Sequence, residues 1–71
     1  MESNGAYLKR MREKAGLSQR RLADLTGVSY STISKLEQHV NDVRLVPAIT
    51  ALRLAHTLGI SVGQLLGMEP R

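Results

Sequence analysis

Four polar side chains lie on one side of the segment from residue 29 to residue 38, at Tyr30, Ser31, Ser34 and Lys35. Each can donate or accept hydrogen bonds, and none is acidic. Groups of this kind bond the edges of bases, and a lysine can donate to O6 and N7 of guanine. A helix that presents such a face to solvent has the composition expected of one that enters the major groove of DNA.

Two short helical patterns joined at Gly27 would position that face. Helices that cross steeply through a short turn need a small side chain where they meet, and Ala23 supplies it. Gly27 can adopt the left-handed conformation that ends the first helix, and Ser29 can cap the second. The residues expected to face the core are Val28, Ile33 and Leu36. Residues 19–38 therefore predict a helix-turn-helix.

The apolar spacing predicts five helices and no strand, so the expected fold class is all-α. The helices should cover about residues 5–15, 19–25, 30–38, 48–58 and 62–66. Their expected N-terminal residues are Ser3 or Asn4, Ser18, Ser29, Pro47 and Ser61. The fourth helix should bury Ala48, Ala51, Leu52, Ala55 and Leu58. All 71 residues are expected to form a single domain.

The composition limits which kinds of functional site are possible and indicates where in the cell the protein is expected. Cysteine is absent, which excludes a disulfide, a thiolate zinc site and a cysteine nucleophile. No apolar run approaches the roughly 20 residues of a membrane span, and the N-terminus lacks the apolar core of a signal peptide. We therefore expect a cytoplasmic protein with no membrane partner, associated with the nucleoid when bound to DNA.

The net charge of +4 is concentrated at the N-terminal end of the chain. Residues 1–21 carry six basic and two acidic side chains, whereas residues 22–71 carry four of each. A basic patch favours a polyanionic partner, although an ordinary solvated helix face would have the same composition.

Residue types suited to catalysis are sparse. His39 and His56 are separated in the sequence and have few carboxylates beside them, so no metal site is predicted. No serine has a suitable histidine and carboxylate in its sequence context, and no glycine-rich phosphate loop is present. We expect a protein that is not an enzyme and requires no cofactor.

The runs LKRMREKAGLSQRRLADLTGVSYSTISKLEQ and LRLAHTLGISVGQLL resemble the Cro and phage-repressor (XRE-type) family of helix-turn-helix DNA-binding domains. The resemblance covers about residues 6–67, and its pieces fall in the order that the family shows. It implies a five-helix, lambda-repressor-like domain. It also implies a homodimer on a roughly palindromic double-stranded DNA operator, with the third helix in the major groove.

The resemblance implies roles for individual residues. The positions that match base-reading residues are Tyr30, Ser31 and Lys35, with Ser34 beside them. Gln19 and Ser29 match positions that contact the DNA backbone near helix N-termini. Arg12 and Glu37 match a pair that forms an internal salt bridge. The sequence departs from the family at Gln38-His39, where many members have Asn-Gly, and histidine adopts a left-handed conformation less freely than glycine.

Several of these residues have two interpretations. Lys35 either reads a base or contacts phosphate or solvent, and Tyr30 either contacts DNA or packs against the first helix. Three further phosphate contacts are expected at Arg20, Thr32 and Arg44. For Arg20 the alternative is a solvated side chain, and for Thr32 it is a local cap.

Apolar residues near the C-terminus exceed what one short helix can bury. Val62, Leu65, Leu66 and Met68 are therefore expected to form a two-fold interface, and Leu25 is a second surplus apolar residue. The predicted function is that of a dimeric, sequence-specific transcriptional regulator of repressor type. One alternative is an antitoxin-type protein that binds DNA and masks a toxin partner, and another is a helical domain that binds RNA or ribosomes.

Overall fold

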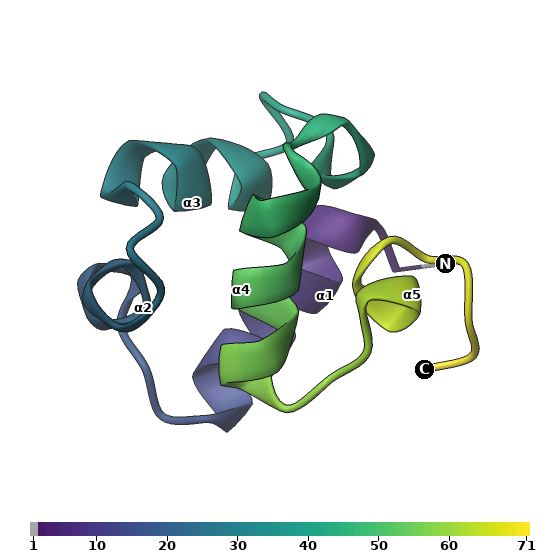
Figure 1. Cartoon of the computed structure of the whole chain (residues 1–71), viewed down its shortest axis with the longest axis horizontal. Helices are drawn as coiled ribbons and strands as arrows, with labels where there is room; N and C mark the ends of the chain where they lie inside the picture. Colours follow the sequence, from purple (N-terminus) through teal and green to yellow (C-terminus); the bar gives the residue numbers. More distant parts are fainter. Residues whose placement is uncertain (1) are drawn as a thin grey trace.

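The computed structural model describes residues 2–71, and every regular element among them is helical (Figure 1). The α-helices are α1 (Asn4–Lys14), α2 (Gln19–Thr26), α3 (Tyr30–Glu37), α4 (Ala48–Leu58) and α5 (Val62–Leu65). A 3-10 helix, η1 (Val43–Leu45), lies in the connection between α3 and α4. The predicted all-α class with five α-helices is confirmed, and the boundaries agree within one or two residues.

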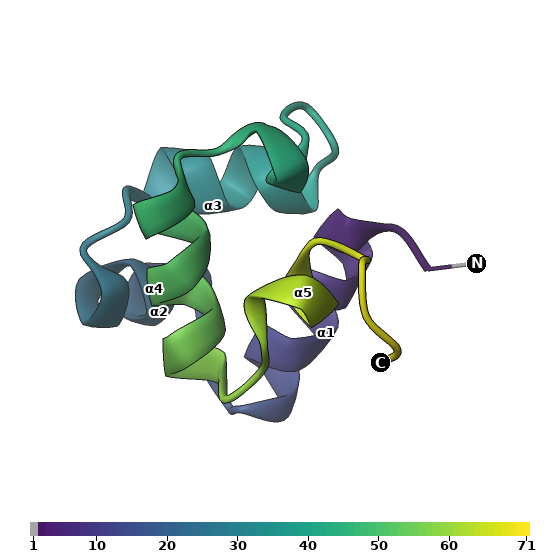
Figure 2. The ribbon, with the colours of Figure 1, turned by 45° about the vertical axis from the view of Figure 1, so that its right-hand side comes forward.

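A single core joins all five helices. The fully buried side chains include Leu8 of α1, Leu22 of α2, Ile33 and Leu36 of α3, Leu54 of α4 and Leu65 of α5. In Figures 1 and 2, α3 lies along one edge of the molecule, and α2, α4 and α1 pack beneath it. One long side of α3 is therefore held by the core, and the opposite side faces solvent.

Side-chain caps begin four of the five α-helices, as the sequence predicts. The hydroxyl groups of Ser3, Ser18, Ser29 and Ser61 each accept a hydrogen bond from a backbone N–H in the first turn of their helix. Such caps satisfy donors that a helix leaves unpaired at its start. Pro47 precedes α4 without a side-chain cap.

The turn between α2 and α3 combines a glycine with a buried threonine. Gly27 has φ +72°, and its N–H donates to the carbonyl of Ala23 at 2.9 Å. The Thr26 hydroxyl donates to the carbonyl of Leu22 at 2.7 Å and accepts from the N–H of Val28 at 3.1 Å. Val28 is buried, so this threonine satisfies a backbone donor that water does not reach.

The buried face of α4 differs from the predicted one. Leu52, expected in the core, is 54% exposed, and Ala48 is also exposed. Leu54 is fully buried in their place, beside Ala51 and Ala55. Because α4 carries apolar residues on most of its circumference, periodicity alone does not select the inward face.

The connection after α3 begins with Gln38, which caps the helix, and His39, which has φ +62°. The N–H groups of Val40 and His39 donate to the carbonyls of Lys35 and Leu36, at 2.9 and 3.3 Å. This pairing is a Schellman motif, and glycine is the usual residue at its left-handed position. The sequence has Gln38-His39 where many family members have Asn-Gly. The left-handed helix end is nevertheless kept, and His39 occupies its left-handed position.

Candidate nucleic-acid interface

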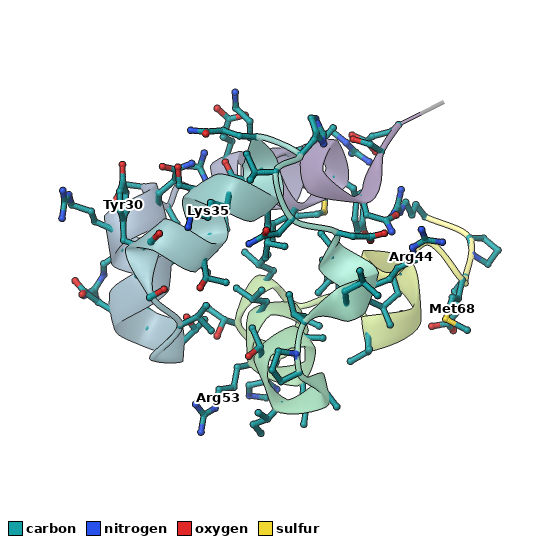
Figure 3. The ribbon with its side chains drawn as sticks, turned by 90° about the horizontal axis from the view of Figure 1, so that it is seen from above. Tyr30, Lys35, Arg44, Arg53 and Met68 are labelled. Atoms are coloured by element: carbon teal, nitrogen blue, oxygen red, sulfur yellow. The ribbon has the colours of Figure 1, made fainter. Side chains whose placement is uncertain are left out.

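The solvent-facing side of α3 presents Tyr30, Ser31 and Lys35. Figure 3 shows Tyr30 and Lys35 on this helix. All three side chains are exposed, and Tyr30, the largest of them, is 41% exposed. Ser34 is half-buried, and its hydroxyl accepts a hydrogen bond from the side-chain amide of Gln38 at 3.0 Å. The structure therefore brings the predicted base-reading residues onto one helix face, with Ser34 at its margin.

The acidic residue of α3 points the other way and is paired inside the protein. Glu37 is 8% exposed, and its carboxylate accepts two hydrogen bonds from the guanidinium of Arg12, at 2.7 and 2.9 Å. Arg12 also donates to the carbonyl of Leu17 at 2.7 Å. The hydrogen bond that Arg12 donates to Glu37 is the main reason why the pKa of Arg12 is raised above its usual value. The solvent-facing side of α3 is consequently free of negative charge.

The side chain of Gln19 bonds to this ion pair. It is half-buried, and its amide nitrogen donates to Oε1 of Glu37 at 3.0 Å. The carboxylate of Glu37 therefore joins α1, α2 and α3 at one point. The amide of Gln19 is thus held in place beside the start of α2, and its oxygen is the atom left to accept a further bond.

Ser29 and Thr32 bond each other at the start of α3. The hydroxyl of Ser29 accepts from the N–H of Thr32 at 3.1 Å and donates to the hydroxyl of Thr32 at 2.8 Å. Ser29 is exposed and Thr32 is half-buried. Both hydroxyls thus have local partners, in keeping with the local role considered for Thr32.

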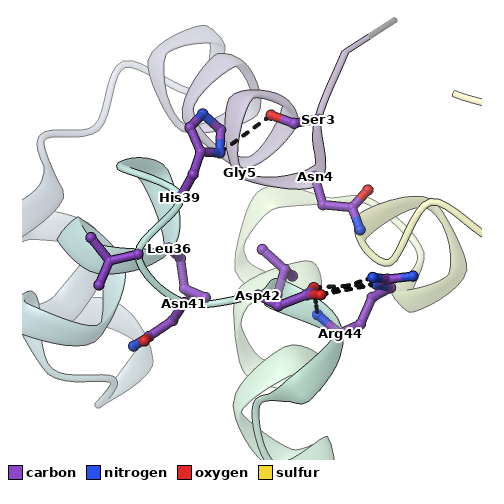
Figure 4. A pocket seen from close by; sticks show the side chains of 10 residues that line it. Ser3, Asn4, Gly5, Leu36, His39, Asn41, Asp42 and Arg44 are labelled. Carbon is purple, nitrogen blue, oxygen red and sulfur yellow. Dashed lines mark hydrogen bonds and ion pairs between the residues drawn. The ribbon is translucent and has the colours of Figure 1, made fainter.

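The two arginines predicted near phosphate make different contacts. The guanidinium of Arg20 lies over the ring of Tyr30, 4.5 Å from its centroid. Arg44 instead forms an ion pair with Asp42, at 2.9 Å (Figure 4). The side-chain hydrogen bond from Arg44 is the main cause of a lowered pKa at Asp42. A phosphate that binds Arg44 must compete with this carboxylate.

A shallow pocket lies between the start of α1 and the end of α3, beside the point where the two helices approach closely (Figure 4). A Cβ atom added at Gly5 would collide with the carbonyl oxygen of Leu36 and touch the ring of His39. His39 Nδ1 also lies 3.5 Å from the hydroxyl of Ser3. Glycine is therefore required at position 5 for α1 to support the end of α3.

Residues 8–65 match the family described as helix-turn-helix. The match covers α2, the turn at Gly27 and α3, as well as the helices that support them. The chain belongs to the helix-turn-helix family. The family is one of DNA-binding transcriptional regulators, and its assignment agrees with the exposed face of α3.

Two curated relatives of this helix-turn-helix domain are named HTH-type transcriptional regulator PuuR, one from Escherichia coli (strain K12) and one from Shigella flexneri. Each is 39% identical over 61 residues, which is 84% of this chain and 31% of the relative. The chain therefore spans about a third of the length of these relatives. No solved structure matches the chain.

The C-terminal apolar residues of the helix-turn-helix domain do not form one surface. The sequence predicts Leu65 at a dimer interface, but its side chain is fully buried in the core of the single chain, because α5 packs inward. Val62 and Leu66 are half-buried and line a mostly apolar groove with Val46, Ile49 and Leu52. Met68 is 77% exposed and lies after α5 (Figure 3).

Sequence reasoning missed the exposed side of α4. Ile49 is 52% exposed and Leu52 is 54% exposed, and together they form one wall of the groove. The signal was present in the sequence, since α4 has more apolar residues than one buried face can hold.

The described residues hold no candidate site for a metal ion. Within residues 2–71, no three histidine, cysteine or acidic side chains lie close enough together to bind an ion. The helices described for the chain are also too short or too polar to cross a membrane.

Proposed function

We propose that this domain binds double-stranded DNA in a sequence-specific manner, with α3 in the major groove, as part of a dimeric regulator of repressor type. The observation that carries the proposal is the division of α3 into two sides. Its inward side is fixed by Ile33, Leu36 and the Arg12–Glu37 pair, and its outward side presents only neutral or basic groups. Such a helix can enter a groove without bringing a negative charge near the phosphates.

Within this proposal, Lys35 and Tyr30 read bases together with Ser31, and Ser34 acts at the margin. Gln19, Ser29 and Thr32 lie at the starts of α2 and α3, where helix N-termini favour phosphate. Arg44 adds a phosphate contact after it leaves Asp42. The Arg12–Glu37 pair holds α3 against α1 and has a structural role.

Lys35→Ala tests the base-reading role. Loss of a donor to guanine O6 and N7 should cost about 1–3 kcal/mol and relax the preference at one base-pair position. Selection from a random duplex pool, followed by titration of single-base variants, measures both effects. Lys14→Ala is a control of equal charge, because Lys14 ends α1 and this end lies opposite α3 in Figures 1 and 2. Equal weakening on every sequence would contradict base reading by Lys35.

We also infer a homodimer in which a second copy covers the groove that Val62, Leu66, Ile49 and Leu52 line. A dimer places two copies of α3 about one helical turn, or roughly 34 Å, apart on DNA. An exposed apolar groove on a small domain supports such an interface. Sedimentation equilibrium without DNA tests it, and a strict monomer at high concentration would contradict it.

A further inference from the structure

Arg20 and Tyr30 form a stacked pair that joins the first turns of α2 and α3. The guanidinium carbon lies 4.5 Å above the centroid of the tyrosine ring, within the range of a cation–π contact. Both side chains are exposed. Among residues 2–71, no acceptor bonds the guanidinium of Arg20, whereas Arg10, Arg12, Arg44 and Arg71 all have hydrogen-bond partners.

The contact with the ring restrains the position of the guanidinium without using its N–H groups. These N–H groups have no hydrogen-bond partner among residues 2–71, so they remain available for a bidentate contact. A fork that is already oriented loses less conformational freedom when it binds than a mobile one. The pair is therefore preorganised to place two parallel N–H donors at the N-terminal end of the base-reading helix.

The surroundings favour a base edge over a phosphate. Arg20 and Tyr30 line a shallow hollow between α2 and α3, and Asp24 lies in the same hollow. A phosphate bound at Arg20 would meet the negative charge of Asp24, which lies one helical turn away on the same face of α2. The phosphate proposed at Ser29 is held instead by the N-terminus of α3. A guanine edge carries no charge and offers two acceptors, O6 and N7, at the spacing of an arginine fork.

We propose that Arg20 is a specificity-determining residue, which donates to O6 and N7 of one guanine in each half-site while Tyr30 holds it in place by stacking. This inference rests on the proposed DNA-binding function. It replaces the phosphate contact expected for Arg20 with base recognition by a residue outside α3. Tyr30 thereby has a positioning role toward Arg20 in addition to its own contacts.

The test compares variants on the best-bound duplex and on every single-base-pair variant of it. Arg20→Ala and Tyr30→Leu should both lose discrimination at the same G·C pair, by at least about fivefold. Arg20→Lys should lose it as well, because lysine keeps the charge but lacks the planar fork. Tyr30→Phe retains the ring and should retain the preference. The double variant should discriminate no worse than Arg20→Ala alone.

Arg21→Ala is the matched control. Arg21 is the adjacent arginine of α2 and is exposed, but it makes no stacking contact among the described residues. Its loss should leave every base preference intact. Thermal unfolding of each variant checks that the fold is retained, which is expected because the substituted side chains are exposed.

Two outcomes would overturn the inference. One is that Arg20→Ala weakens all duplexes by the same factor and lowers the salt dependence, as loss of a phosphate contact does. The other is that Tyr30→Leu keeps the preference that Arg20→Ala loses. If Lys35→Ala still relaxes a different position in either case, the proposed function stands and only the role of Arg20 fails. A wild-type domain that prefers no duplex would overturn both.

Discussion

At the scale of single residues, the carboxylate of Glu37 is the most connected polar group of the candidate interface. It accepts hydrogen bonds from Arg12 and Gln19, and the side chains of the Arg12–Glu37 pair are 10% and 3% exposed. A buried pair of this kind adds little net stability compared with an apolar pair of the same volume. Loss of one partner, however, leaves the other charge buried and unpaired.

Glu37→Gln should therefore lower the free energy of unfolding by about 3–5 kcal/mol, because the Arg12 guanidinium loses its counter-charge. Urea unfolding of the wild type and the variant measures the difference. The double variant Arg12→Met/Glu37→Leu should be less destabilised than Glu37→Gln. A single variant as stable as the wild type would mean that water reaches Arg12.

Asp42 pairs with Arg44, for which a phosphate contact is proposed. Asp42→Asn should strengthen DNA binding by up to about fivefold, since an exposed ion pair of this kind is worth under about 1 kcal/mol. Asparagine can still accept from the N–H of Arg44, as Asp42 does at 2.9 Å, so η1 should be retained. Filter-binding titration at fixed salt measures the gain. The same gain in an Arg44→Ala background would show that Arg44 is not the residue released.

At the scale of elements, the junction of α2 and α3 depends on the Thr26 hydroxyl. Thr26→Val keeps the shape but leaves the buried N–H of Val28 without an acceptor. The expected loss of unfolding free energy is about 1–3 kcal/mol. Thr26→Ser, which keeps the hydroxyl, should lose less. Chemical denaturation of both variants provides the comparison, and equal losses would show that the methyl group matters more than the hydrogen bond.

The predictability of these elements follows the range of the interactions that form them. Caps at Ser18, Ser29 and Ser61 and the left-handed Gly27 depend on residues within one turn, so the sequence predicts them correctly. The inward face of α4 depends on packing against distant helices, so the sequence pattern wrongly predicts Leu52 in the core and misses Leu54.

The candidate site shows the same division. Exposure of Tyr30 and Lys35 follows from the helical spacing of α3 alone. The contact between Arg20 and Tyr30 joins two helices whose crossing geometry no local pattern specifies. The buried state of Leu65 has the same origin, since a four-residue helix offers too little periodicity to distinguish its two sides.

At the scale of the whole molecule, the groove beside α4 and α5 determines the proposed oligomeric state. Leu52→Glu places a charge where a second copy is proposed to pack, so the dimer should dissociate while each chain stays folded. Sedimentation velocity over a wide concentration range measures this. Leu25→Glu is the control, because Leu25 is 49% exposed and lies on α2, outside the groove. Dissociation by Leu25→Glu alone would place the interface elsewhere.

The buried and the exposed side of α3 use different residues, and this separation has a consequence for protein engineering. Ile33, Leu36 and Glu37 hold the helix in place, whereas Tyr30, Ser31 and Lys35 are exposed and contribute little to packing. A library randomised at those three exposed positions should yield mostly folded members. Such a library could change the DNA sequence that the domain prefers while the fold stays the same.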